Sequence, residues 1–310
     1  MIKIIMCTYN GERYLRQQIQ SILENTRTDW HLYISDDGSS DATVEIIESY
    51  QKAYPGKISG GKHKIRNGSA EHFLEMVKTT ADEMQEEDFV MLCDQDDVWN
   101  RDKIEITYRA MKKLIKHHGN GIPLLVCSDV CVTDENLQVI APSFAKANHY
   151  NVKKMAFAQL MMENKVQGST IMINKALAGM IDRIPKHMKM HDCWLGLIAA
   201  AFGKLMYINR PTMMYRQHVD NVMGNTDFWT DMRNKIYNLD KQRAIVMSTT
   251  KQIKDFIEIY GDRLSDSRKK EAFAFASLPQ QNFVKRRYTI MKYHMWKSGL
   301  LRNIGLMILI

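Results

Sequence analysis

Three carboxylates follow a short apolar run in the first third of the chain. The run Phe89–Leu92 leads directly into Cys93-Asp94-Gln95-Asp96-Asp97. This pattern predicts a buried strand that ends in acidic side chains. Because side chains alternate along an extended segment, Asp94 and Asp96 would reach the same side, where they repel each other unless a cation lies between them. Mg²⁺ or Mn²⁺, shared with substrate phosphates, is the natural partner, and the alternative is a solvated acidic turn that caps a helix.

Two further polar turns follow apolar runs with strand character. Thr8-Tyr9-Asn10-Gly11-Glu12 comes after Ile2–Cys7, and Asp36-Asp37-Gly38-Ser39 comes after His31–Ser35. Their carboxylates could accept hydrogen bonds from a pyrimidine base or from ribose hydroxyls, while the tyrosine offers an aromatic face. Ordinary turn chemistry, with Asx turns and a helix cap, is the alternative for both. Neither turn has the Gly-x-Gly-x-x-Gly spacing of dinucleotide-binding sites, which disfavours a nicotinamide-dependent enzyme.

The second half of the chain contributes one more carboxylate that could do chemistry. Asp192 lies in His191-Asp192-Cys193-Trp194, at the start of an almost wholly apolar helical stretch that Gly203 ends. A carboxylate interacts favourably with a helix N-terminus, so a capping role is one explanation. The functional interpretation is a general base, with Trp194 as a wall or stacking platform for a sugar. Gly168 indicates a tight turn or a close backbone approach, and His218 taken alone fits a structural histidine.

Apolar periodicity places these turns within alternating strands and helices. Strand-like runs at 2–7, 31–35, 62–65 and 89–93 alternate with helical spacing that begins near residues 15, 44, 70 and 104. This order predicts βαβ units, hence an α/β fold with a mostly parallel sheet flanked by helices. Ligands of such sheets bind at the carboxyl ends of the strands, so the three polar turns should line one crevice.

Composition limits the class of protein. The 310 residues are 45% hydrophobic and 25% charged, which is ordinary for a globular chain. The five cysteines form neither a zinc pattern nor an even disulfide set, which favours a reducing compartment. There is no signal-peptide pattern and no run of about 20 apolar residues, so we expect a cytosolic protein without a spanning helix.

The net charge of +8 is concentrated near the end of the chain. After residue 268, basic residues alternate with aromatic and aliphatic ones up to the apolar stretch Ile304–Ile310. This pattern suggests contact with an anionic membrane surface, and the alternative is a basic helix packed on the body of the protein. No nucleic-acid recognition module accompanies the charge, so nucleic acid is not an expected partner.

Taken together, the motifs resemble the inverting family 2 glycosyltransferases of the GT-A (Rossmann-like) fold, especially bacterial rhamnosyltransferases that build surface polysaccharides. The likeness covers about residues 2–225, in the family's order and spacing. Besides the three turns, it rests on Asn164 with Gly168, on His191-Asp192 with Trp194, and on Tyr215-Arg216-Gln217-His218. It implies a catalytic domain at 1–225, with a nucleotide-binding half at 1–100 and an acceptor-binding half at 101–225. A helical, basic C-terminal extension would follow at 226–310.

The resemblance also implies roles for individual residues. The nucleotide-sugar donor would be held by Thr8, Tyr9, Asn10, Glu12, Asp37, Asp94 and Gln95. A Mn²⁺ or Mg²⁺ ion would be bound by Asp94, Asp96 and His218. The acceptor would be bound by Trp99, Gly168, His191 and Trp194, and Asp192 would be the catalytic base.

The implied function is transfer of a hexose to a hydroxyl of a growing, lipid-linked cell-surface polysaccharide, at the inner face of the cell membrane. Overall likeness favours rhamnose from dTDP-rhamnose, and a UDP-hexose donor is the first alternative. A metal-dependent nucleotidyltransferase or phosphatase would also use strand-end aspartates, although common phosphatases carry them after the first strand. A non-catalytic sugar-binding module is the remaining alternative.

Overall fold

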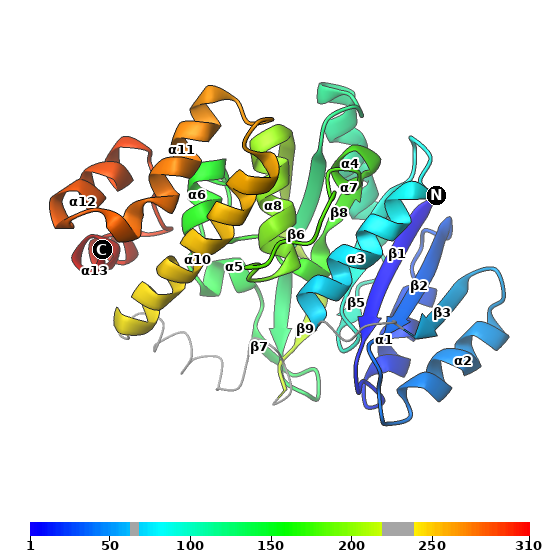
Figure 1. The fold of residues 1–310 in the computed structure, drawn as a ribbon. Helices are drawn as coiled ribbons and strands as arrows, with labels where there is room; N and C mark the ends of the chain where they lie inside the picture. Colours follow the sequence, from blue (N-terminus) through cyan, green and yellow to red (C-terminus); the bar gives the residue numbers. More distant parts are fainter. Residues whose placement is uncertain (63–67, 219–238) are drawn as a thin grey trace.

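One mixed sheet runs through the molecule, with helices on both faces (Figure 1). The computed structural model describes residues 1–62, 68–218 and 239–310. The strands are β1 (Ile2–Thr8), β2 (Trp30–Asp36), β3 (Ile58–Lys62), β4 (Phe89–Cys93), β5 (Val98–Trp99), β6 (Leu124–Thr133), β7 (Val139–Ala141), β8 (Met172–Asn174) and β9 (Lys204–Arg216).

The helices of the first 218 residues are α1 (Leu15–Leu23), α2 (Thr43–Ala53), α3 (Ser69–Asp82), α4 (Lys103–His118), α5 (Phe144–Ala147), α6 (Phe157–Met162), α7 (Lys175–Ala178) and α8 (His191–Phe202), with the 3-10 turn η1 (Gly168–Thr170). Those nearer the C-terminus are α10 (Leu239–Tyr260), α11 (Asp266–Ala276), α12 (Phe283–Lys292) and α13 (Leu300–Leu309), with the 3-10 turn η2 (Leu278–Gln280).

The first half of the sheet is parallel, as predicted. Strands β3, β2, β1 and β4 lie in that order, and each pair is parallel. The third strand, however, occupies residues 58–62 rather than 62–65, and residues 63–67 lie outside the described part. Its two glycines weaken the apolar signal, but a Cβ on Gly60 would lie only 2.6 Å from the side chain of Ile47, so the strand needs a glycine there.

The second half of the sheet is mixed, which limits the prediction of a mostly parallel sheet to the first 93 residues. Strand β8 is antiparallel to both β4 and β6, β6 is parallel to β9, and the short β5 is antiparallel to β9. Only residues 94–97 separate β4 from β5, too few for the crossover that a parallel neighbour needs. The chain therefore leaves the parallel sheet at residues 94–97, which we call the acidic turn.

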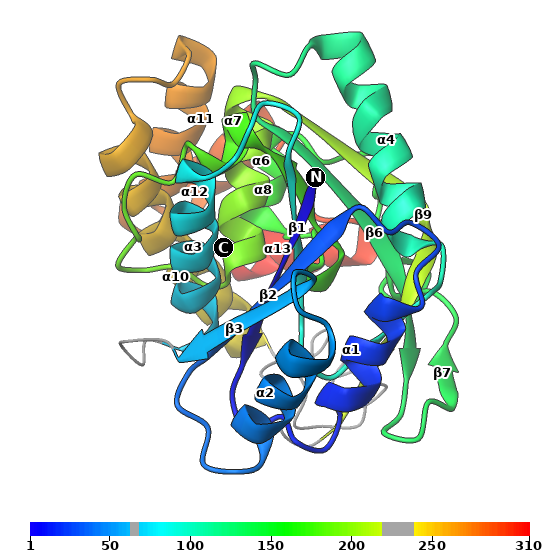
Figure 2. The same ribbon diagram turned by 90° about the vertical axis from the view of Figure 1, so that its right-hand side faces the viewer.

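Alternating side chains divide the core into two layers. Ile4 and Met91 face the layer under α1 and α4, whereas Ile5 and Leu92 face the layer under α3 and α8. Figure 2 shows α1 and α4 on one side of the sheet and α3 and α8 on the other. Both layers hold the strands rigidly, so the turns at their carboxyl ends have a fixed scaffold.

The C-terminal helices pack on α8 and continue the same core. Trp194 on α8 contacts the rings of Phe256 and Tyr260 on α10, with centroids 5.3 and 5.9 Å apart. The helical character predicted for the C-terminal extension is confirmed from Leu239 onward, while residues 219–238 lie outside the described part. The division of the chain near residue 225 stays a prediction. Within the described ranges, every helix is too short or too polar to cross a membrane.

Candidate functional site

The turns after β1, β2 and β4 lie side by side at one edge of the sheet. Thr8 is opposite Asp36 in the β1–β2 register, and β4 pairs with β1 on its other side. The Tyr9 N–H donates to Gln95 Oε1 at 2.9 Å, and Gln95 Nε2 donates back to the Tyr9 carbonyl at 3.0 Å. The predicted convergence of the three turns is therefore confirmed.

Three of the residues expected to hold the donor stabilise the turns themselves. The Thr8 hydroxyl donates to Asp36 Oδ2 at 2.9 Å, and Asn10 Oδ1 accepts the Ser40 N–H at 2.9 Å. Glu12 Oε2 accepts a backbone N–H just before α2 at 2.8 Å. The turn-chemistry explanation therefore applies to these side chains, whatever they contribute to a ligand.

The backbone of the first turn is closely fitted to the acidic turn. Asn10 has a φ of 46°, the left-handed region that asparagine tolerates better than most residues. A Cβ on Gly11 would lie 2.4 Å from Gln95 Oε1, so only glycine allows this approach. The ring of Tyr9 is 40% exposed at this edge, whereas Asp37 is buried behind the turn.

The acidic turn concentrates negative charge. Burial is the main cause that raises the pKa of Asp94 to about 7, and the nearby charges of Asp96 and Asp192 raise it further. Burial, then Asp96 and Asp94, also raise the pKa of Asp97 well above its usual value. Such an excess of carboxylates is what a divalent cation would relieve.

The end of β9 is fastened to this acidic turn. His218 Nε2 lies 2.8 Å from Asp96 Oδ2, although the two residues are 122 positions apart. The Arg216 N–H donates to Asp97 Oδ1 at 3.1 Å, and its Nε donates to the Asp96 carbonyl at 2.8 Å. Asp96 and His218, which the resemblance assigned to one metal ion, are thus in direct contact, and their role as metal ligands stays a prediction.

A metal ion would need further ligands here. In the residues that the structure describes, no three His, Cys, Asp or Glu side chains are grouped so that they could hold a metal ion. The oxygen atoms of Asp94 and Asp96, with the His218 nitrogen, nevertheless fit Mg²⁺ or Mn²⁺ when a substrate diphosphate supplies the remaining ligands. The closeness of Asp94, Asp96 and Asp97 in one turn, which raises the pKa of Asp94 and of Asp97, is the observation in favour of that fit.

Asp192 lies in the first turn of α8, as predicted, and it faces the turn η1. Its Oδ1 accepts the Cys193 N–H at 2.6 Å, and the Gly168 N–H and the Asn164 side chain lie near enough to favour its ionised form. Burial outweighs these groups and raises the pKa of Asp192 to about 6. A carboxyl group with that pKa is ionised at neutral pH and can still accept a proton, which suits a general base.

The turn η1 joins Asp192 to the acidic turn. The Ser169 side chain favours the ionised form of Asp94, and the Gly168 N–H favours that of Asp192, so η1 lies beside both carboxylates. Lys103 Nζ, fully buried, donates to the Ser169 carbonyl at 3.1 Å. One short turn therefore adjoins both the candidate base and a candidate metal ligand.

His191 explains why residue 168 is a glycine. A Cβ there would lie 2.6 Å from His191 Nε2, so the predicted close approach is confirmed. His191 is buried beside the ring of Phe73, and burial lowers its pKa to about 3. Neither ring nitrogen has a hydrogen-bond partner within the described chain. Both nitrogens are covered in this conformation, so His191 supports the turn η1 from the core, and the prediction that it binds the acceptor directly is not met here.

The two tryptophans correct the predicted acceptor site. Trp194 is completely buried between α8 and α10, and Trp99 is 3% exposed in the opposite core layer. Neither indole ring is available as a stacking platform in this conformation. Trp194 lies two positions after Asp192 on the same helix, so it points away from the site and towards α10.

Sequence reasoning missed Lys103 and Ser169. Lys103 is the first residue of α4, where the helix dipole disfavours a cation. That mismatch was a usable signal, because a lysine in such a place needs a specific partner. Ser169 gave no signal beyond its position next to Gly168.

Known proteins resemble the chain in sequence. Residues 3–116 match the profile described as "Glycosyl transferase family 2". The chain is 29% identical over 229 residues to the dTDP-rhamnosyl transferase RfbG of Shigella flexneri, covering 71% of this chain and 73% of that protein. Residues 3–116 therefore carry a family 2 glycosyltransferase domain. This glycosyltransferase is also 22% identical over 204 residues to the UDP-Glc:alpha-D-GlcNAc-diphosphoundecaprenol beta-1,3-glucosyltransferase WfgD of Escherichia coli, covering 64% of this chain and 70% of that one.

Solved structures agree on the fold of the glycosyltransferase. The mannosyltransferase PcManGT from Pyrobaculum calidifontis, in complex with GDP-Man and Mn2+, superimposes with a TM-score of 0.51. The match covers 99% of this chain and 83% of that one at 16% identity, so it shows the fold alone. The fold is GT-A, as the motifs predicted.

Proposed function

We propose that this glycosyltransferase moves a sugar from a nucleotide-sugar donor to an acceptor hydroxyl, with inversion at the anomeric carbon. The observation that carries the proposal is that Asp192 and Asp94 both lie beside the turn η1, close enough for the charge of Asp192 to raise the pKa of Asp94. A general base and a donor-side carboxylate are therefore held close together. That arrangement suits a single displacement, in which the acceptor and the leaving group lie on opposite sides of one carbon.

Each residue has a distinct task in the proposed reaction. Asp192 takes the proton of the acceptor hydroxyl while its oxygen forms a bond to the anomeric carbon. The bond from that carbon to the diphosphate oxygen breaks, and its electron pair leaves with the nucleoside diphosphate. Asp94, Asp96 and His218 would hold Mg²⁺ or Mn²⁺, which neutralises charge on the leaving diphosphate. No covalent intermediate is required, so no nucleophilic side chain is needed.

The other residues of the site bind and orient the substrates. We assign the donor to Tyr9, Asp37 and Gln95, which lie on turns built by Thr8, Asn10 and Glu12. We assign the acceptor to the backbone of Gly168, which the buried ring of His191 supports from below. Trp99 and Trp194 support these groups from the core.

The relatives guide the choice of substrates. The likeness to a dTDP-rhamnosyl transferase favours dTDP-rhamnose as the donor, and UDP-hexose is the alternative, since the second relative is named for UDP-Glc. That same relative is named for a diphosphoundecaprenol-linked sugar, which supports a lipid-linked acceptor for this enzyme as well. We therefore propose that it works at the inner face of the cell membrane, in the assembly of a surface polysaccharide.

A donor screen tests this proposal. The protein is incubated with dTDP-rhamnose, UDP-glucose, UDP-galactose, UDP-N-acetylglucosamine or GDP-mannose, and release of nucleoside diphosphate is measured with Mn²⁺ and with EDTA. We expect metal-dependent release from dTDP-rhamnose alone. Release from a UDP-sugar instead would overturn the assignment of the donor. If no donor is used and neither dTDP nor UDP raises the melting temperature with metal, the function itself is wrong.

A further inference from the structure

The last two helices expose apolar side chains that the core does not use. On α12 these are Phe283, Val284, Tyr288 and Met291, which are 52–73% exposed. Their spacing places them on one helical face, and Thr289 and Ile290 on the other face are buried. Elsewhere in the described residues, exposed large apolar side chains such as Tyr54 and Val139 are isolated along the chain.

Helix α13 repeats the pattern beside α12. Leu300, Leu301, Ile304 and Ile308 are 48–79% exposed, while Leu306 is buried. Arg287 of α12 lies over the ring of Phe283 and donates a hydrogen bond to the carbonyl of Ile308 at 3.3 Å, so the start of α12 and the end of α13 are close to each other. We call these eight side chains the α12–α13 patch. An apolar surface of this extent on a soluble domain usually marks an interaction site.

The charge around the patch has one sign. After Glu271 the chain contains no acidic residue but six basic ones, at positions 285, 286, 287, 292, 297 and 302. Lys285 and Lys292 are exposed on α12, next to the apolar side chains. A segment whose apolar residues alternate only with cations suits a surface that is apolar inside and anionic outside, which is the character of a phospholipid membrane.

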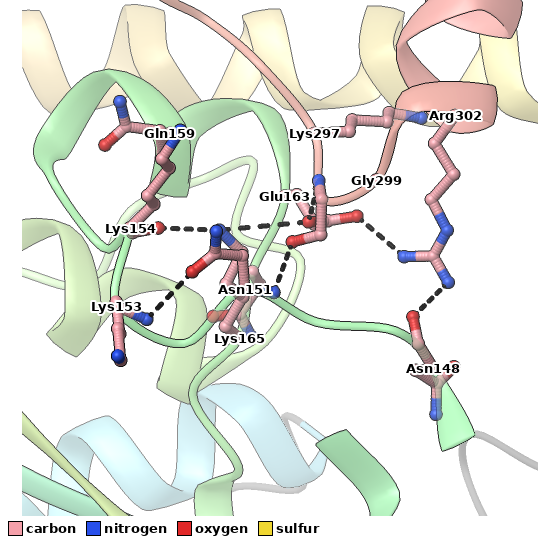
Figure 3. A network of polar contacts seen from close by, with 12 residues as sticks. Asn148, Asn151, Lys153, Lys154, Gln159, Glu163, Lys165, Lys297, Gly299 and Arg302 are labelled. Carbon is pink, nitrogen blue, oxygen red and sulfur yellow. Dashed lines mark hydrogen bonds and ion pairs between the residues drawn. The ribbon is translucent and has the colours of Figure 1, made fainter. Parts of the chain in front are cut away.

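The patch is fixed to the acceptor half by a buried carboxylate. Glu163, 9% exposed, accepts hydrogen bonds from Arg302 Nη1 at 2.9 Å and from the Ser298 N–H at 2.8 Å. Arg302 also donates to the Asn148 carbonyl, and Figure 3 shows it bridging Glu163 and Asn148. The next residue after Glu163, Asn164, lies beside Asp192.

We propose that the α12–α13 patch is the membrane-docking surface of the protein, and that its partner is an anionic phospholipid bilayer. Through Glu163 and Asn164 the docked helices belong to the same framework as Asp192. A lipid-linked acceptor held in the same membrane would then meet the base in a fixed orientation. This inference rests on the proposed function for its purpose, but not for its test.

Flotation with vesicles tests the surface directly. The full chain is mixed with vesicles of phosphatidylcholine alone, or with about one third phosphatidylglycerol, at low and high salt. We expect flotation with the anionic vesicles only, and at least tenfold weaker binding at high salt. Equal flotation with both vesicles, or with neither, would overturn the proposal.

Variants test whether vesicle binding depends on the α12–α13 patch rather than on another part of the molecule. Val284→Glu with Leu301→Glu should weaken vesicle binding at least tenfold, and Lys285→Glu with Lys292→Glu should do the same at low salt. The matched control is Val139→Glu on β7, where the replaced apolar side chain is 58% exposed. This variant should bind vesicles as the wild type does. Equal melting temperatures exclude unfolding as the cause. If the apolar variants keep wild-type flotation, the patch is not the docking surface.

Two other results would contradict the proposal in distinct ways. A wild-type dimer that becomes monomeric in Val284→Glu with Leu301→Glu, without vesicle binding, would mean that the patch joins two copies of the chain. Donor turnover in solution reports separately on the proposed function. Loss of flotation in the variants supports the membrane surface even if no donor in the screen is used.

Discussion

The pH dependence of transfer tests the proposed base most directly. With a pKa of about 6, Asp192 is about nine-tenths ionised at pH 7 and one-tenth ionised at pH 5. Because only the ionised form accepts a proton, kcat/KM should fall about tenfold for each unit of pH below 6. The Asp192→Asn variant cannot accept the proton. We expect it to lower kcat by about 10²- to 10⁴-fold and to abolish this fall in activity at acid pH, the acid limb of the pH profile.

The acidic turn should add a second acid limb to the pH profile of activity, and a saturating metal concentration should remove it. Asp94, with its pKa raised to about 7 by burial and its neighbours, must also be ionised to bind a cation. At limiting Mn²⁺, activity should therefore begin to fall near pH 7, whereas saturating Mn²⁺ favours the ionised carboxylate and leaves only the limb near pH 6. Both carboxylates gain protons as the pH falls, so both limbs lie on the acid side.

The assay is initial-rate nucleoside diphosphate release from pH 4.5 to 8 at two Mn²⁺ concentrations, with the substrates varied from below KM to saturation so that both kcat/KM and kcat are obtained. Asn is close to Asp in size, but its amide group would oppose one of the N–H donors of Gly168 and Cys193. Circular dichroism and donor binding should therefore be measured for the variant as controls. A wild-type rate and an unchanged acid limb in Asp192→Asn would refute the assignment of the base.

Three further predictions concern the surroundings of the site. Asp96→Ala should weaken Mn²⁺ binding at least tenfold, because His218 alone cannot hold the ion. The measurement is a Mn²⁺ titration of activity after EDTA treatment. If the variant regains activity at the Mn²⁺ concentration that the wild type requires, this prediction is wrong. Lys103→Met removes the buried cation near Asp94, so the pH at which activity falls at limiting Mn²⁺ should rise. Lys103→Arg keeps a cation there and should shift this pH less. Glu163→Gln should lower the free energy of unfolding by about 2 kcal/mol in urea titrations, because it leaves Arg302 uncompensated. Its control, Glu258→Gln, breaks an exposed pair with Arg183 and should change stability by less than about 1 kcal/mol.

Local signals explain what the sequence predicted well. The strands β1, β2 and β4 are short apolar runs, and each ends in a polar turn, so neither their existence nor the position of the turns depended on distant residues. The approach of Gly168 to another part of the chain was also foreseeable, because glycine marks such contacts. His218 was different, since its own neighbours favoured a structural role, and only the combined motifs brought it to Asp96.

Long-range packing explains the errors. Trp194 looks like a surface platform when its helix is considered alone, but α10 covers it with residues some 60 positions later in the chain. Likewise, nothing within residues 94–99 announces that β5 will pair with β9. Such pairings depend on the whole topology, whereas periodicity reports only which side of a segment is apolar.

The turn η1 gives a physical reason why the two halves of the site should change together. Ser169 lies beside Asp94, Gly168 lies beside Asp192, and Lys103 holds the Ser169 carbonyl. A shift of this turn by a few tenths of an ångström would alter both carboxylates at once. Gly168→Ala forces such a shift, because its methyl group would lie 2.6 Å from His191 Nε2. We therefore expect this variant to raise the Mn²⁺ requirement as well as to lower kcat, whereas a defect in acceptor binding alone would leave the Mn²⁺ requirement unchanged.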